Sequence, residues 1–140
     1  MKVSLAAQIF SQRVASTMKG ILRLAPDKLS NTAEGTAEFC LFMNNAFDSV
    51  NGTNINSNIE LRCAVQSKSV HHDFWLEAIK TFESMKFLRS NGAQYVLPTV
   101  KNWIHSLKGL RYLWHTLNSK GFDFLSGKAE CVLTKDPIKK

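Results

Sequence analysis

The chain has 140 residues, of which 44% are hydrophobic and 21% are charged, and this balance excludes a disordered polar chain. Its net charge is +7, and no apolar run reaches the length of a membrane-spanning helix, so we expect no membrane partner. Three cysteines without metal-ligand spacing are typical of reduced thiols, so we expect an intracellular protein that is not secreted.

The first segment carries apolar residues at helical spacing on two faces. One face holds Val3, Ala7, Phe10, Val14, Met18 and Ile21, and the second holds Leu5 and Ile9. A helix that is apolar on two sides is normally buried between layers. We therefore expect a helix here that suits the interior of a larger core.

A second helix is expected after Pro26, because Asn31 followed by Glu34 is typical of a helix start. Its predicted apolar stripe consists of Phe39, Phe42, Met43, Ala46, Phe47 and Val50. The polar residues 51–59 that follow predict a mobile surface loop.

Two more helices are expected in the second half of the chain. The third runs from Asp73 to Leu88 and is ended by Ser90-Asn91-Gly92, and the fourth starts near Pro98. The fourth has a seven-residue apolar pattern, at Val100, Trp103, Ile104, Leu107, Leu110, Trp114 and Leu117. Only residues 61–66 and 122–125 are weak candidates for strands. The predicted fold class is all-α, a domain of about four to six helices.

A trio of residues in the second helix suggests nucleotide chemistry. Asn44 and Asp48 are four residues apart and therefore share a helix face, with Phe47 beside them. A carboxylate can accept hydrogen bonds from a guanine edge, an amide can donate to its carbonyl, and an aromatic ring can stack on the base. The alternative is that Asn and Asp form a cap or turn and that Phe47 packs in the core.

Three segments, in this order, resemble the P element transposase family: KVSLAAQIFS (2–11), MNNAFDSVNG (43–52) and NWIHSLKGLRYLWHTLNSKGFDFL (102–125). The resemblance is to the part of those transposases that carries the GTP-binding insertion domain. It implies that residues 1–125 are such a domain and that residues 1–20 continue a helix of an RNase H-like catalytic core. Residues 126–140 depart from the family pattern, and we interpret them as a divergent tail.

The resemblance also implies which residues bind the cofactor. Lys2, Val3, Asn44, Phe47 and Asp48 match the nucleotide-contacting positions of the family. Asp48 would meet the base edge, Phe47 would stack, Asn44 would make a polar contact, Lys2 would offset negative charge, and Val3 would pack. In the family, GTP is an assembly cofactor for DNA transposition and is not hydrolysed for energy, and magnesium can accompany it. The pocket also draws on residues that lie upstream of KVSLAAQ.

No catalytic residue is expected in this chain. The catalytic aspartates of the family precede this segment and a glutamate follows it, whereas Lys139 stands near the position of that glutamate here, after Asp136-Pro137. We therefore expect a fragment without transposase activity of its own, because such activity needs three carboxylates around two metal ions. A different hypothesis is a domesticated helical protein-interaction module that binds no nucleotide.

Nucleic-acid contact is a third possibility. Residues 91–120 carry four Lys or Arg and no acid, and Lys101, Lys108 and Arg111 share one side of the fourth helix with His105 and His115. Such a face can contact phosphates, although a solvated amphipathic face would look the same. The resemblance implies transposon-end DNA as a partner of the full transposase and a nuclear location, and it leaves self-association open. For His71-His72-Asp73, helix capping by Asp73 is favoured over a metal site.

Overall fold

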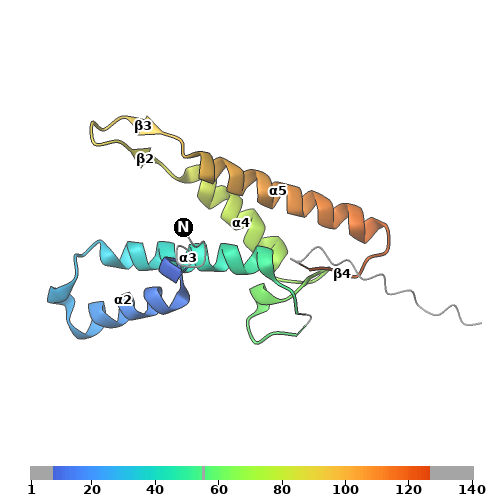
Figure 1. The fold of residues 1–140 in the computed structure, drawn as a ribbon, viewed down its shortest axis with the longest axis horizontal. Coiled ribbons are helices and arrows are strands. Elements are labelled where there is room, and N and C mark those ends of the chain that lie inside the picture. The colour runs from blue at the N-terminus through green and yellow to red at the C-terminus, as the bar shows by residue number, and fades with distance from the viewer. Residues whose placement is uncertain (1–7, 55, 127–140) are drawn as a thin grey trace, which may run out of the picture. The chain divides into compact units, whose positions relative to one another are not determined.

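The computed structural model describes residues 8–54 and 56–126 (Figure 1). Its described residues are mostly helical, which confirms the predicted fold class. The elements are the α-helices α2 (Gln12–Leu24), α3 (Ala33–Asn51), α4 (His71–Ser84) and α5 (Pro98–Ser119), the 3-10 helices η1 (Pro26–Lys28) and η2 (Glu60–Arg62), and the strands β1 (Val65–Gln66), β2 (Phe87–Leu88), β3 (Gln94–Tyr95) and β4 (Phe124–Leu125).

The chain divides into two compact units, residues 1–50 and residues 51–140. The first unit contains α2, η1 and most of α3, and the second contains the remaining elements. Within the described ranges, no helix combines the length and the apolar character that crossing a membrane requires.

The first apolar segment is interrupted, and the prediction of an unbroken helix through residue 21 was wrong. Gln8 and Ile9 are helical, the chain turns at Phe10 and Ser11, and α2 begins at Gln12. The Ser11 hydroxyl accepts a hydrogen bond from the backbone N–H of Val14 at 3.3 Å and so caps α2. The hydrophobic periodicity continues through this turn, so periodicity alone could not reveal the cap. Val3, Leu5 and Ala7 lie outside the described residues.

The buried side of α3 differs in part from the predicted stripe. Met43 and Ala46 are buried as expected, but Phe39 is 38% exposed and Phe47 is half-buried. Smaller residues occupy the rest of the buried side, namely Ala33, Ala37, Cys40 and Ser49. The sequence pattern predicted that the phenylalanines are buried because they are the more hydrophobic residues. In a close-packed core, however, the size of a side chain also decides whether it can be buried, and smaller residues are buried here.

In the second unit, α4 and α5 pack as an antiparallel pair (Figure 1). Phe82 near the end of α4 stacks on Trp103 near the start of α5, with ring centroids 5.7 Å apart. At the other end, His72 meets Trp114 at 5.6 Å. The α5 core positions Val100, Leu107 and Trp114 are buried at seven-residue intervals, which confirms the predicted spacing.

Short strands close both ends of this helix pair. β1 pairs with β4 in antiparallel register, Val65 opposite Leu125, so each weak strand candidate contains a strand of two residues, whereas residues 61 and 62 belong to η2. β2 and β3 form a hairpin between α4 and α5, with Phe87 opposite Tyr95. The predicted third helix was therefore too long: it ends at Ser84, because Met85 is extended and the next residues pair with β3.

Candidate functional site

Asn44 and Asp48 interact directly on one face of α3. The Asn44 side-chain nitrogen Nδ2 donates a hydrogen bond to Asp48 Oδ2 at 3.0 Å. Residues four apart on a helix are neighbours, and a hydrogen bond to an ionised carboxylate is stronger than one between neutral groups. The structure thus brings together two of the predicted site residues, and the hydrogen bond from Asn44 holds the Asp48 carboxylate in position.

The other end of the Asn44 amide reaches α2. Asn44 Oδ1 accepts a hydrogen bond from the backbone N–H of Gln12 at 3.3 Å. Gln12 is the first residue of α2, where a helix leaves its backbone N–H groups without intrahelical partners. Asn44 therefore links the start of α2 to Asp48, and Phe10 and Phe39 support this link by an edge-to-face contact at 5.8 Å. The sequence did not predict this role for Asn44, although Ser11 as a helix cap was a usable signal.

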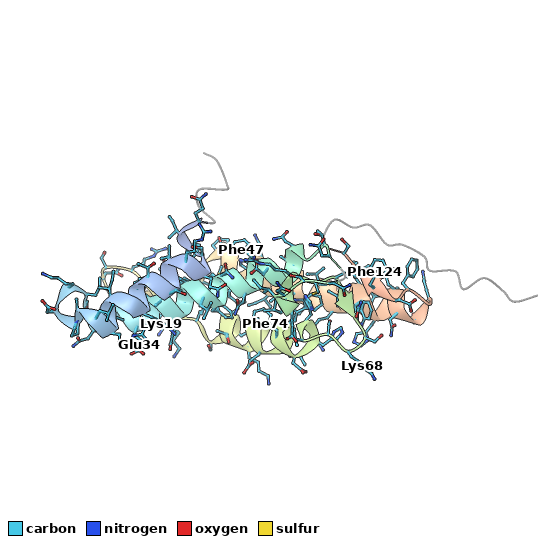
Figure 2. The ribbon with its side chains drawn as sticks, turned by 90° about the horizontal axis from the view of Figure 1, so that it is seen from below. Lys19, Glu34, Phe47, Lys68, Phe74 and Phe124 are labelled. Atoms are coloured by element: carbon cyan, nitrogen blue, oxygen red, sulfur yellow. The ribbon has the colours of Figure 1, made fainter. Side chains whose placement is uncertain are left out.

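Phe47 lies in the last part of α3, far along that helix from Glu34 (Figure 2). Its side chain is neither fully buried nor fully exposed. Ala46, which precedes it, and Ser49, two residues after it, are buried, at 0% and 2% exposure. Phe47 thus lies at the edge of the buried side of α3, next to Asp48, where part of its ring remains accessible.

The trio has a chemistry that suits a purine base with hydrogen-bond donors on its edge. The Asp48 carboxylate can accept from N–H groups, and an aromatic ring beside it can cover a base face. Lys2 and Val3, the two remaining cofactor-binding residues expected from the sequence, lie outside the described residues.

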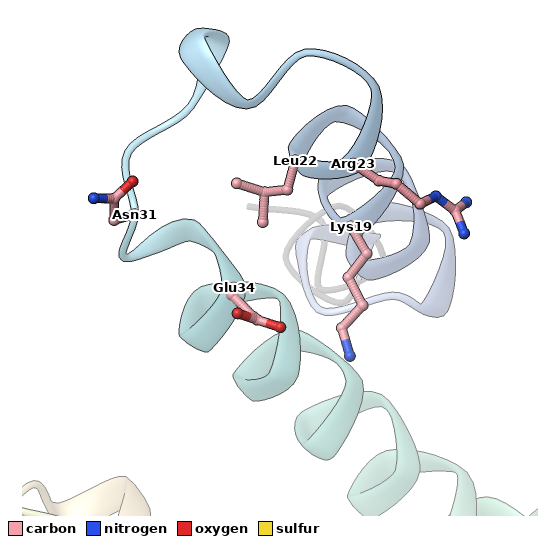
Figure 3. Close-up of a pocket in the computed structure, with 5 residues that line it drawn as sticks. All are labelled: Lys19, Leu22, Arg23, Asn31 and Glu34. Carbon is pink, nitrogen blue, oxygen red and sulfur yellow. The ribbon is translucent and has the colours of Figure 1, made fainter.

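A second feature of the first unit is a hollow between the end of α2 and the start of α3, which we call the α2–α3 hollow (Figure 3). It encloses about 530 Å³ and is lined by Lys19, Leu22, Arg23, Asn31 and Glu34. Leu22 points towards the segment that carries Asn31 and Glu34, whereas the Arg23 guanidinium points away from it. The lining combines two basic residues, Lys19 and Arg23, with one acidic residue, Glu34.

In the second unit, the three basic residues predicted on the fourth helix have different surroundings. Lys101 is exposed. Lys108 pairs with Glu83 of α4, at 2.8 Å between Nζ and Oε1, and both side chains are about half exposed. Arg111 is half-buried and lines a hollow of about 400 Å³, which we call the α4–α5 hollow. The three residues therefore do not form one uniform basic face: Lys101 is exposed, Lys108 is in an ion pair, and Arg111 lines a hollow.

The two adjacent histidines at the start of α4 bind backbone carbonyl groups. His71 is fully buried, with Nε2 at 3.2 Å from the carbonyl oxygen of Leu61 and Nδ1 at 3.1 Å from Ser69 Oγ. Burial lowers the pKa of His71 from its ordinary value of 6.5, since the charged form loses hydration. His72 Nε2 lies 2.7 Å from the carbonyl oxygen of Gln66. Residues 8–54 and 56–126 contain no group of three or more His, Cys, Asp or Glu that could hold a metal ion.

The prediction that Asp73 caps α4 was wrong, because α4 begins before Asp73. The N-cap of α4 is Val70, and Asp73 lies in the first helical turn. A carboxylate in the first turn still interacts favourably with the helix dipole. The sequence placed the start of α4 two residues too late because the histidines at its first positions are not typical helix-starting residues.

Comparison with known proteins identifies the first part of the chain. Residues 1–64 match the sequence profile of a family described as TNP-like, GTP-binding insertion domain. No curated protein matches the chain. A solved structure, described as Drosophila P element transposase strand transfer complex, matches with a TM-score of 0.72 and 24% sequence identity. The match covers 92% of this chain and 29% of the transposase chain, so this chain spans less than a third of that protein.

The family match contains both α2 and α3, and therefore contains Asn44, Phe47 and Asp48. The structural match extends beyond it and shows that the remaining helices also have the fold of part of that transposase. Residues 1–64 are therefore similar to the TNP-like, GTP-binding insertion domain family, and the chain has a fold similar to part of the P element transposase, in agreement with the resemblance of its motifs.

Proposed function

We propose that this chain binds guanine nucleotide on the face of α3 that carries Asn44, Phe47 and Asp48. The observation that carries the proposal is the family match over residues 1–64, which contains these residues on one helix. The hydrogen bond from Asn44 to Asp48 supports it, because a carboxylate held in place loses less conformational entropy when it binds a ligand.

Each residue has a distinct role in the proposed site. Asp48 accepts hydrogen bonds from the guanine edge, and Phe47 covers a face of the base. Asn44 is a positioning residue, because its amide is engaged with Gln12 and Asp48. Lys2 offsets phosphate charge and Val3 packs beside the nucleotide. Magnesium can accompany the nucleotide, and it would neutralise part of the phosphate charge.

The proposal also concerns the parent protein from which such a domain derives. We infer that residues 1–125 form the insertion domain and that residues 126–140 are a divergent tail, with residues 1–20 continuing an RNase H-like core helix. In that context GTP would serve as an assembly cofactor, the partner would be transposon-end DNA, and the location would be the nucleus. We also propose that the chain alone has no catalytic activity, as the sequence resemblance implies, because the catalytic carboxylates of the family lie outside the insertion domain.

A second candidate function is a helical protein-interaction module that binds no nucleotide. Large apolar side chains exposed on the first two helical segments favour it, with Ile9 at 61% and Leu24 at 85% exposure. Such side chains form a binding face where they gather into a contiguous patch. A titration with GTP distinguishes the two functions, because an interaction module of this kind would not bind GTP.

The experiment that tests the nucleotide site compares two conservative variants on α3. Asp48→Asn removes the charge but keeps an oxygen that can accept from Asn44, whereas Glu38→Gln makes the same change at an exposed position ten residues earlier. We expect Asp48→Asn to weaken GTP binding about ten-fold or more, since a charged hydrogen bond is lost. Glu38→Gln should change the affinity less than about two-fold. Equal effects of the two variants would contradict a site at Asp48.

A further inference from the structure

The α4–α5 hollow lies between the N-terminal part of α4 and the C-terminal half of α5. None of the described residues that line it belongs to the proposed guanine site. Its polar lining consists of Ser67, His72, Arg111, His115 and Asn118, and its apolar wall includes Trp114. None of the described residues that line it is a carboxylate.

The positive charge in this hollow is available to a ligand. Arg111 has no ion-pair or hydrogen-bond partner among the described residues, unlike Lys108, which Glu83 neutralises. His115 is four residues after Arg111 on α5 and therefore lies on the same helix face. A guanidinium group presents several N–H donors in a plane, a geometry that matches the oxygens of a phosphate.

The remaining polar groups are held in position. The Ser67 hydroxyl donates to Asn118 Oδ1 at 3.4 Å, so the Asn118 amide nitrogen keeps its N–H donors for other partners. His72 is fixed by its 2.7 Å contact with the Gln66 carbonyl oxygen and by ring contacts with Trp75 and Trp114. Donors fixed before binding give more affinity than donors that must be ordered by the ligand.

The helix ends also favour an anion. His72 is the second residue of α4, so the hollow adjoins the positive end of that helix dipole. The C-terminal end of α5 has the opposite sign, but its last carbonyl groups accept hydrogen bonds from the backbone N–H groups of Lys120, Gly121 and Phe122. These bonds reduce the negative field at that end.

We propose that the α4–α5 hollow is a phosphate-binding site, in which Arg111 and His115 contact the anion and Asn118 donates a further hydrogen bond. The ligand class is a phosphate group, either free or as part of a nucleic-acid backbone. The chemistry of the lining residues recognises the phosphate itself and no particular base. Arg111, one of the three basic residues that the sequence singled out, is thus the principal anion contact of this site.

The test is an NMR titration of the histidine ring signals of the whole chain, with inorganic phosphate added at fixed pH and ionic strength. The chain has four histidines, and His105 on α5 does not line the hollow, so it serves as an internal control. We expect saturable shifts for His72 and His115 and none for His105. Shifts of similar size for all exposed histidines would overturn the proposal, because they would indicate non-specific binding.

Two variants of α5 make the test specific. Arg111→Gln should weaken phosphate binding about ten-fold or more, since a charge-assisted contact is lost, whereas Lys101→Gln removes the same charge outside the hollow and should weaken it less than about two-fold. Equal losses would overturn the site. Because Arg111 is half-buried, the exposed His115→Gln provides a second variant that is expected to keep the fold and to weaken phosphate binding.

A second titration arm, with a 12-base-pair DNA duplex, distinguishes the two sources of phosphate. If the duplex shifts His72 and His115 and added phosphate reverses the shift, the ligand is the nucleic-acid backbone. If phosphate binds and the duplex leaves these signals unchanged, the site takes a free phosphate group. Neither titration involves Asp48. A negative result would therefore refute the phosphate site without refuting the guanine site.

Discussion

At the scale of single residues, Asn44 is the most consequential side chain of the first unit. Its amide accepts from the Gln12 backbone and donates to Asp48, so it joins the start of α2 to the proposed nucleotide site. The sequence predicted the shared face of Asn44 and Asp48 from their spacing alone. It could not predict the contact with Gln12, because that bond joins residues 32 positions apart and depends on how α2 packs on α3.

Replacement of Asn44 by alanine should destabilise the fold. The matched control is Asn45→Ala, since the neighbouring amide makes no hydrogen bond of this kind and gains the same helix propensity from the change. We expect Asn44→Ala to be less stable than Asn45→Ala by about 1–2 kcal/mol, because two hydrogen bonds are lost. Urea denaturation followed by circular dichroism measures the difference, and equal stabilities would show that the two bonds contribute nothing.

His71 should make stability depend on pH. Burial lowers its pKa below 6.5 in the folded chain, so well above pH 6.5 the residue is neutral in both states and contributes no pH dependence. Below that value the unfolded chain takes up a proton that the folded chain resists, and stability falls by at most about 1.4 kcal/mol per pH unit until the folded pKa is reached.

The measurement for His71 is the free energy of unfolding at pH 7.5 and at pH 5.5. His71→Gln should reduce the loss of stability between the two pH values, whereas His105→Gln, a change at an exposed position, should leave it unaltered. The explanation would be refuted by a pH dependence that survives unchanged in His71→Gln.

At the scale of elements, α3, α4 and α5 were predictable, because their apolar residues recur at helical spacing and Pro98 marks the start of α5. The break before α2 and the hairpin β2–β3 were not. In the hairpin, Phe87 and Leu88 continue a helical pattern but pair with β3 instead, and Arg89 lies over the Tyr95 ring at 5.6 Å. Such contacts between strands outweigh the local preference for helix, and the hydrophobic periodicity of the sequence does not reveal them.

Two glycines should respond in opposite ways to alanine. Gly92 in the hairpin turn has φ +79°, a conformation that L residues adopt at a cost, and Gly109 lies inside α5 with no neighbour within 4 Å of an added Cβ. We expect Gly92→Ala to destabilise by about 1–2 kcal/mol. Gly109→Ala should stabilise by about 0.5–1 kcal/mol, because glycine is a poor helix former.

Thermal unfolding of the two glycine variants, measured side by side, checks this pair of expectations. The added methyl group meets no atom within 4 Å at either position, so the difference reports backbone conformation alone. A stabilised Gly92→Ala would mean that the turn does not have the positive φ described here.

For the molecule as a whole, the fold is similar to part of a transposase, and its first 64 residues match the TNP-like, GTP-binding insertion domain family. The family resemblance could be predicted because short motifs survive where overall identity is 24%. The α4–α5 hollow could not be predicted, because its lining comes from the loop before α4 and from two helices, and only the register between α4 and α5 brings Ser67 and His72 to Arg111.

A calorimetric titration of the folded chain with GTP and, in parallel, with ATP tests the proposed guanine site on α3. We expect saturable binding of GTP and binding of ATP that is about ten-fold weaker or more, since Asp48 meets donors on the guanine edge that adenine does not present. A folded chain that shows no saturable GTP binding, or that binds both nucleotides equally, would contradict the guanine site and leave the helical interaction module as the better account.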